Sequence, residues 1–132
     1  MSLRTPVARA RGLGSAKQGA HHWWVQRLTA VALIPLIIWF AISVIGMIAA
    51  ADSGDAGYAA MVAWMSNPIA ATLMIGLLAA GFYHAALGMQ VVYEDYIEPK
   101  WLEVAVNVVT RLVLAFFGIA SIVSVLMIAF GG

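Results

Sequence analysis

The sequence has 132 residues, of which 64% are hydrophobic and only 10% are charged, with a formal net charge of +1. A mean hydropathy of +0.95 excludes an ordinary soluble globular domain and indicates an integral membrane protein. The absence of cysteine excludes disulfides and thiolate metal sites within the chain. The apolar runs leave only a tail and two short loops outside a membrane. Because this is too little for a catalytic domain, we expect a component of a larger complex.

The N-terminal segment, residues 1–27, is a basic tail that leads into the first apolar run. It holds five of the seven basic residues, and no acidic residue precedes Asp52. These five residues are Arg4, Arg9, Arg11, Lys17 and Arg27. An N-terminus that contains arginine and lacks acids also resembles a mitochondrial transit peptide. A mitochondrial inner membrane is therefore an alternative to a bacterial one.

Three apolar runs follow, and each is long enough to cross a hydrocarbon core of about 30 Å as a helix. We predict helices over about 28–51, 69–93 and 104–130. The first run is too long for the apolar core of a cleavable signal peptide, and Pro68 suits the first position of the second helix. In the intervening loop, Tyr58 and Trp64 suit a membrane interface. Residues 28–130 are thus predicted to form an all-α membrane anchor with three transmembrane helices.

The basic residues also predict the orientation of these helices. The tail carries five, the first loop carries none, and the second loop region carries Lys100 and Arg111. The positive-inside rule places the tail and the second loop on the cytoplasmic side, or on the matrix side in a mitochondrion. We expect a multi-pass protein of the bacterial inner membrane with a cytoplasmic N-terminus.

His84 lies inside the uncharged run from Ile69 to Tyr93. An ionisable ring at membrane depth is costly and marks a candidate functional site, either a heme ligand or a step in a proton relay. The plainer alternative is a histidine that is hydrogen-bonded to a neighbouring helix. Small residues surround His84 and would leave room for a flat macrocycle: Ala80, Gly81, Ala85 and Gly88. Since His21 and His22 precede the first helix, a bis-histidine heme needs its second ligand from another chain.

Asp95 and Tyr96 follow just past the end of the same run. Asp95 follows His84 by eleven residues. On a continuous helix, residues eleven apart point in directions that differ by roughly 20° and lie about 16 Å apart along the axis. A phenol can donate a hydrogen bond to a quinone carbonyl, and a nearby carboxylate can help to deliver protons. These two residues are candidates for a quinone site, although a solvated helix end is the commoner arrangement for such a pair.

A third group lies at the start of the first helix. Trp23 and Trp24 are typical of an aromatic belt at the membrane interface, and Arg27 is typical of a positive-inside anchor. At this boundary, Arg27 could also pair with heme propionates or stabilise the anion of a partly reduced quinone. Arg111 is interpreted as a cation that reaches toward the interface along its aliphatic stem.

Residues 84–99, HAALGMQVVYEDYIEP, resemble the signature of the small hydrophobic membrane anchor of succinate dehydrogenase (respiratory complex II). The matching positions are His84, Ala85, Gly88, Met89, Asp95, Tyr96 and Pro99. The order and length of the three helices also match. So does a histidine six residues before an arginine, His21 and Arg27, although His22 competes for that position.

This resemblance implies a role for each candidate residue. His84 would be an axial ligand of a heme b that is shared with a second anchor subunit, and the two anchors would form a heterodimeric helix bundle. Tyr96 would hydrogen-bond the ubiquinone head group, with Asp95 in the same site. Arg27 and His21 would lie near the heme propionates.

The implied function is electron transfer from succinate to ubiquinone, a reaction of the tricarboxylic acid cycle and of electron transport. The chain would not be catalytic alone, because the electrons arrive through a flavoprotein subunit and an iron–sulfur subunit. The other expected partner is membrane lipid, and no nucleic acid is expected. Two alternatives are the anchor of a quinol:fumarate reductase and a structural membrane subunit without a cofactor.

Overall fold

The computed structural model describes residues 16–50 and 54–131, and nearly all of these residues are helical. The helices are α2 (Ala16–Ala50), α3 (Gly54–Met65), α4 (Pro68–Tyr96) and α5 (Lys100–Gly131). Three of them are long and apolar enough to cross a membrane, over Gly19–Ala50, Pro68–Tyr96 and Lys100–Gly131. The predicted all-α fold with three transmembrane helices is confirmed.

The boundaries of α4 follow from local sequence signals. Asn67 caps its N-terminus, because the side-chain Oδ1 accepts a hydrogen bond from the backbone N–H of Ile69 at 2.9 Å. Pro68 occupies the first turn, where a missing N–H costs nothing. At the other end, the Ile97 N–H donates to the Tyr93 carbonyl at 3.0 Å. Pro99 then prevents α4 from running directly into α5.

All three long helices extend beyond the apolar runs that predict them. Helix α2 begins at Ala16 rather than near Leu28, so part of the predicted tail is already helical. Helix α4 continues to Tyr96, and α5 begins at Lys100. Helix propensity does not end at the membrane boundary, because Gln, Glu and Lys are also good helix formers. An apolar run therefore reports the thickness of the hydrocarbon core rather than the length of the helix.

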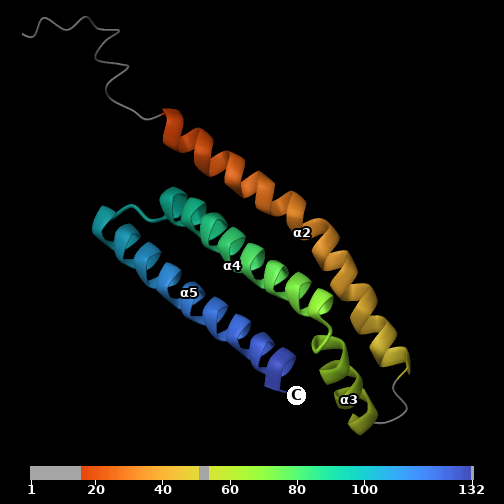
Figure 1. The fold of residues 1–132 in the computed structure, drawn as a ribbon. Helices are drawn as coiled ribbons and strands as arrows, with labels where there is room; N and C mark the ends of the chain where they lie inside the picture. The colour runs from red at the N-terminus through yellow and green to blue at the C-terminus, as the bar shows by residue number, and fades with distance from the viewer. Residues whose placement is uncertain (1–15, 51–53, 132) are drawn as a thin grey trace, which may run out of the picture.

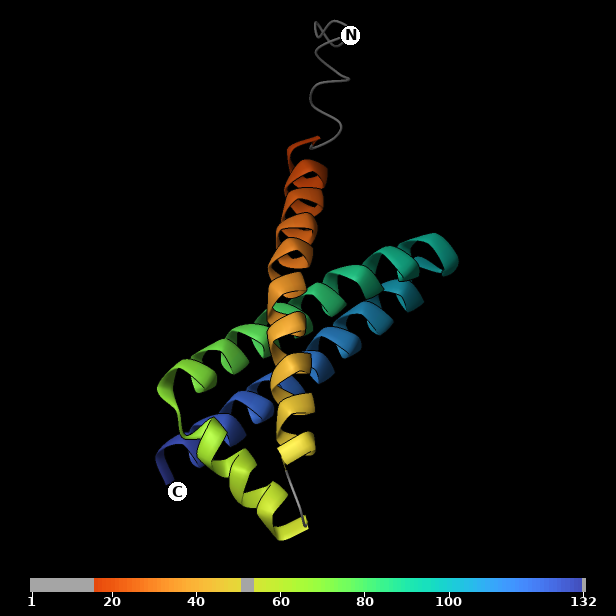
Figure 2. The same ribbon diagram turned by 90° about the vertical axis from the view of Figure 1, so that its right-hand side faces the viewer.

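Helix α4 lies between the other two long helices and packs against both α2 and α5 (Figure 1). After the quarter turn of Figure 2, α4 and α5 run side by side and α2 crosses them obliquely. Helix α3 is a short helix at the end of the molecule that lies opposite the α4–α5 loop. This arrangement leaves one side of α4 facing α2 and another side facing α5.

A small buried cluster lies at the α3 end of the molecule. Its buried members come from three helices: Met65, Ala71, Met74 and Val125. Trp64 packs against this cluster and stacks on Trp39 of α2, with 5.3 Å between ring centroids. Trp64 is therefore a packing residue, and Tyr58 on α3 is exposed.

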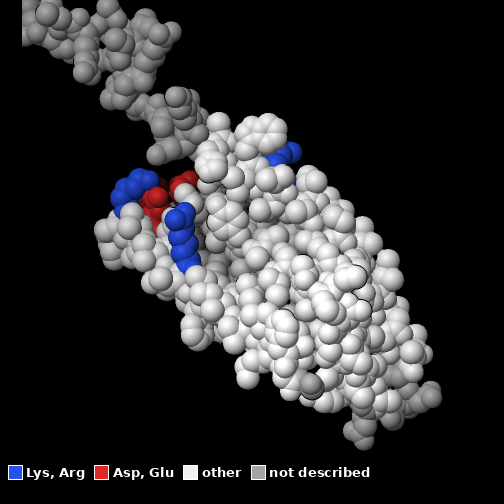
Figure 3. All heavy atoms as spheres, viewed as in Figure 1, with Lys and Arg blue, Asp and Glu red and all other residues white. Residues whose placement is uncertain are grey.

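Most of the apolar surface is exposed. Ile42 on α2, Phe116 and Met127 on α5 are each more than 60% exposed. In Figure 3 the charged side chains lie at one end of the molecule, where α2 begins, α4 ends and α5 begins, and the rest of that face is uncharged. A large contiguous apolar surface is unfavourable in water and is expected for helices in contact with lipid or with other membrane proteins.

Gly118 of α5 packs tightly against Phe82 of α4, and a side chain at this position is expected to disturb the contact. A Cβ atom added at Gly118 would lie 3.3 Å from Cγ of Phe82 and 3.5 Å from its Cβ. Gly118→Val is therefore expected to push the two helices apart at a cost of about 1–3 kcal/mol. Thermal denaturation of the protein in detergent measures this loss. Gly46→Val is the matched control, because a Cβ at Gly46 meets nothing within 4 Å. Equal stability of the two variants would contradict the packing described here.

Candidate functional site

His84 lies on the side of α4 that faces α2 and is half-buried. Its Nδ1 lies 3.0 Å from the hydroxyl oxygen of Thr29 on α2. One ring nitrogen of His84 thus makes the hydrogen bond to a neighbouring helix that the plainer interpretation of the sequence expects. The other nitrogen, Nε2, forms no hydrogen bond with the residues that the structure describes. One side of the ring is held, and the other is available to a ligand.

His84 and Arg27 line the same hollow, which has a volume of about 410 Å³. The other described residues of its lining all come from α2: Trp23, Gln26, Ala30, Val31 and Ile34. The guanidinium carbon of Arg27 lies 4.8 Å from the centre of the Trp23 ring, a favourable cation–π arrangement. An imidazole and a guanidinium in one hollow are the groups that would hold a metal-centred macrocycle with anionic substituents.

His21 does not share this hollow. Together with His22 it lines a second one, bounded also by Gln90 and Glu94 of α4 and by Arg111 of α5. The separation has a geometric cause, because two residues six apart on a helix point in directions about 120° apart. Since the helix already begins at Ala16, His21 and Arg27 are directed toward different neighbours. The structure thus brings Arg27 to His84 and leaves His21 elsewhere.

The small residues around His84 pack against α2. A Cβ at Gly81 would lie 3.9 Å from Cδ2 of Leu33, and one at Gly88 would lie 3.8 Å from Nε2 of Gln26. Both glycines are therefore partly covered by α2 and do not simply leave space beside the imidazole. Both glycines thus lie at the interface between α2 and α4, where they face the ends of α2 side chains.

Asp95 and Tyr96 form the last turn of α4, on the same unbroken helix as His84. Tyr96 is 83% exposed, and Asp95 is also exposed. Neither side chain forms a hydrogen bond or an ion pair with another residue in the described part of the chain. The spacing of eleven residues on a continuous helix places Asp95 near the face of His84. The described residues present the two side chains but do not enclose them.

A set of hydrogen-bonded polar side chains connects α4 and α5, and we did not predict it from the sequence. Arg111 donates a hydrogen bond to Oε1 of Gln90, and Nε2 of Gln90 donates to Oε1 of Glu94 at 2.7 Å. The Tyr93 and Thr110 hydroxyls lie 3.0 Å apart. Arg111 is thus part of an interhelical network as well as a boundary cation. The signal that could have indicated this network is a glutamine within an otherwise apolar run, one turn before Glu94.

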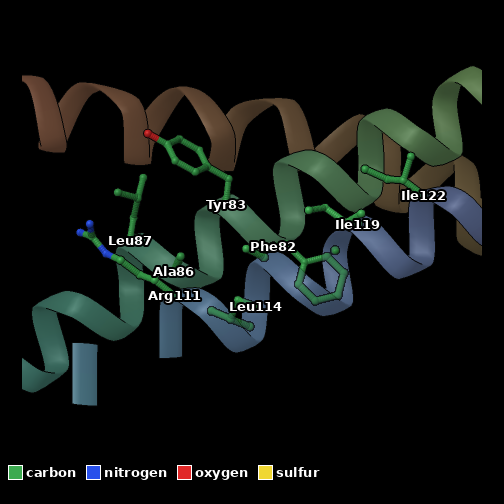
Figure 4. A pocket seen from close by; sticks show the side chains of 10 residues that line it. Phe82, Tyr83, Ala86, Leu87, Arg111, Leu114, Ile119 and Ile122 are labelled. Atoms are coloured by element: carbon green, nitrogen blue, oxygen red, sulfur yellow. The ribbon is translucent and has the colours of Figure 1, made fainter. Parts of the chain in front are cut away.

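An apolar hollow of about 390 Å³ lies between α4 and α5 next to this network. Figure 4 shows Arg111 and Leu87 at one end of it, Phe82 in the middle and Ile122 at the other end. The described residues of its lining include no histidine, cysteine or carboxylate. Within residues 16–50 and 54–131, moreover, no group of three or more His, Cys, Asp or Glu side chains could hold a metal ion. If His84 binds a metal, it would do so as a single ligand among the described residues, which would suit a metal held in a macrocycle of its own.

The comparisons with known proteins agree over nearly the whole sequence. Residues 1–128 match the family model of the succinate dehydrogenase/fumarate reductase transmembrane subunit. The chain is similar to the succinate dehydrogenase hydrophobic membrane anchor subunit of Rickettsia bellii, with 32% identity over 129 residues, 97% of this chain and 94% of the relative. The subunit of the same name from Paracoccus denitrificans is 30% identical over 98 residues, 74% of this chain and 71% of the relative. This chain belongs to the family of succinate dehydrogenase and fumarate reductase transmembrane subunits.

Proposed function

We propose that this chain is the hydrophobic membrane anchor of a bacterial succinate dehydrogenase and contributes to a heme b site and a quinone site. The anchor role is supported by the family match over residues 1–128 and by the names of the curated relatives. It also fits the three helices with membrane-spanning length and the large exposed apolar surface. The same family includes fumarate reductase subunits, and the relatives named succinate dehydrogenase favour succinate oxidation.

The heme assignment depends on one observation. His84, half-buried at membrane depth, shares a hollow with Arg27 while its Nδ1 is hydrogen-bonded to Thr29. Nε2 is the nitrogen left to bind iron, and Arg27 would pair with a propionate. When bound, the heme would supply a one-electron carrier within the membrane. A structural subunit without a cofactor would account for the hydrogen bond to Thr29, but it assigns no role to Nε2 or to Arg27 in the same hollow.

The heme site requires a second subunit. The hollow is open, and its described lining consists of residues of α2 and α4 with one histidine among them. A second axial histidine and the far wall of the cavity would therefore come from another anchor subunit that packs on this face. That partner would also cover part of the exposed apolar surface of α2.

The quinone assignment uses the end of α4. The Tyr96 hydroxyl would donate a hydrogen bond to a quinone carbonyl, and the Asp95 carboxylate would pass protons from the adjacent aqueous phase. Since both side chains are exposed here, they are available to a pocket completed by the iron–sulfur subunit and the second anchor subunit. The positive-inside rule places this end on the cytoplasmic side, where those subunits would dock.

Purification of the full chain from its native membrane in a mild detergent tests this proposal. We expect a flavoprotein, an iron–sulfur protein and a second hydrophobic subunit to co-purify, with succinate:quinone reductase activity in the same fraction. Faster fumarate reduction by quinol than succinate oxidation would favour the fumarate reductase alternative. Purification of the chain without a flavoprotein or an iron–sulfur protein would contradict the anchor role.

A further inference from the structure

The hydroxyl of Thr29 lies within hydrogen-bond distance of three polar atoms but has only one hydrogen to donate. Its oxygen lies 2.9 Å from the Val25 carbonyl and 3.0 Å from the Gln26 carbonyl, both of which can only accept a hydrogen bond. The same oxygen lies 3.0 Å from Nδ1 of His84. A hydroxyl can donate once and can still accept through its lone pairs. The position of its hydrogen is therefore linked to whether Nδ1 of His84 donates or accepts in this contact.

Only one set of hydrogen-bond directions gives every one of these atoms a suitable partner. The Thr29 hydroxyl donates back to a carbonyl of its own helix, as threonine commonly does within helices. Nδ1 of His84 then carries a hydrogen and donates it to the Thr29 oxygen. In the reverse arrangement, the hydroxyl lone pairs would face both carbonyl oxygens. In a neutral imidazole with a hydrogen on Nδ1, Nε2 is the nitrogen with the free lone pair.

The packing of α2 on α4 holds this hydrogen bond in place. Gln26 lies against Gly88 and Leu33 lies against Gly81, so the Thr29–His84 pair sits between two close contacts of an antiparallel helix pair. Each glycine is about one turn from His84 along α4. A Cβ at Gly81 would lie 3.9 Å from Leu33 and one at Gly88 would lie 3.8 Å from Gln26, so α2 is in van der Waals reach of α4 on both sides of the pair. These contacts thus flank the hydrogen bond between the hydroxyl and the imidazole.

We propose that Thr29 is the positioning residue of His84, and that its hydroxyl, by accepting the Nδ1 hydrogen, fixes the ring with Nε2 as the iron-binding nitrogen. This inference rests on the proposed heme site. Partners in this position generally fix the tautomer and ring orientation of a metal-binding histidine and raise its basicity. Thr29 would not contact the iron and acts only through His84.

The test compares Thr29→Val with Thr29→Ser in the purified complex, using Thr72→Val as the matched control. Valine keeps the shape of threonine and removes the hydroxyl, whereas serine keeps the hydroxyl. The Thr72 hydroxyl also donates to a carbonyl four residues earlier, Pro68 at 2.8 Å, but it is exposed and has no histidine partner among the described residues. Two readouts are independent of turnover: the rate of heme transfer to excess apomyoglobin, and the midpoint potential of the heme from a redox titration followed by absorption.

We expect Thr29→Val to weaken heme retention by about 10-fold or more. We also expect a more positive midpoint potential, because a less basic imidazole stabilises ferric iron less. Thr29→Ser and Thr72→Val should resemble the unaltered complex. If Thr29→Val does not assemble, Thr29→Ala removes the same hydroxyl in a smaller side chain and is expected to give the same two changes. Heme retention and potential that are unchanged in an assembled hydroxyl-free variant would overturn the role of Thr29.

His84→Ala in the same experiment separates this inference from the proposed function. If His84→Ala loses the heme while the hydroxyl-free variants behave like the unaltered complex, His84 remains the ligand and only the role of Thr29 is refuted. If His84→Ala retains an unaltered heme, the heme site proposed for His84 fails, and the role of Thr29 fails with it.

Discussion

Replacing His84 with alanine is expected to abolish the b-type band in the reduced-minus-oxidised absorption spectrum of the assembled complex. Among the described residues, His84 is the only histidine that lines the hollow shared with Arg27, so no neighbouring imidazole of this lining can substitute for it. Assembly is checked in the same sample by the presence of the flavoprotein and the iron–sulfur subunit. An assembled His84→Ala complex with an unchanged band would remove His84 from the heme site.

A complementary variant shows whether the lost group is the imidazole itself. In His84→Gly, added imidazole should enter the vacated space and restore part of the band. Gln90→Leu is a suitable control on the same helix, because Gln90 faces Arg111 of α5 and not the hollow of His84. We expect Gln90→Leu to keep a normal heme spectrum. Loss of the band in this control would show that the spectrum reports general damage to α4.

Replacing Tyr96 with phenylalanine is expected to lower quinone reduction by roughly 5- to 150-fold. The variant removes only the hydroxyl, and an acceptor left without its partner in a closed site costs about 1–3 kcal/mol. Succinate oxidation by an artificial acceptor that takes electrons from the iron–sulfur subunit should not change. The measurement is the ratio of these two rates in membranes with equal amounts of the complex.

Tyr58→Phe is the matched control for this experiment. Tyr58 lies on α3 at the opposite end of the molecule and is also highly exposed, at 72%. We expect it to leave both rates unchanged. A parallel fall of both rates in Tyr96→Phe would show that Tyr96 stabilises the complex and does not act on the quinone.

The sequence predicts the three spanning helices well because the physical constraint is simple. A helix must keep apolar side chains over the thickness of the hydrocarbon core, and an uncharged apolar run of that length is rare outside membrane proteins. The start of α4 is predictable for a local reason, because the Asn67-Pro68 pair is a cap followed by a first-turn proline. The spacing of His84 and Asp95 predicts a shared face on a continuous helix, but the apolar run, which ends at Tyr93, did not predict that α4 continues to Tyr96.

The partners of these side chains could not be predicted in the same way. Periodicity shows which residues share a face of one helix, but it does not show which neighbouring helix lies against that face. By sequence alone Thr29 is an ordinary polar residue in an apolar run, and only the packing of α2 on α4 places it beside His84. The early start of α2, which separates His21 from Arg27, involves polar residues that do not mark a membrane segment.

The incompleteness of both candidate sites has a common physical cause. The hollow of His84 is walled by two helices of this chain, and Tyr96 is almost fully exposed. A heme or a quinone head needs contact on both faces and exclusion from lipid and water. In the proposed function the chain would provide one half of each site, and its exposed apolar faces would provide the surface on which a second subunit completes them.

The most direct test of this account is the heme content and the electron paramagnetic resonance spectrum of the unaltered, oxidised complex. We predict a stoichiometric heme b with the low-spin ferric signal of two histidine ligands, one of them His84 and the other from the second anchor subunit. A fully assembled, active complex that contains no heme would contradict the account. So would a high-spin signal, because it would indicate that no second histidine is bound.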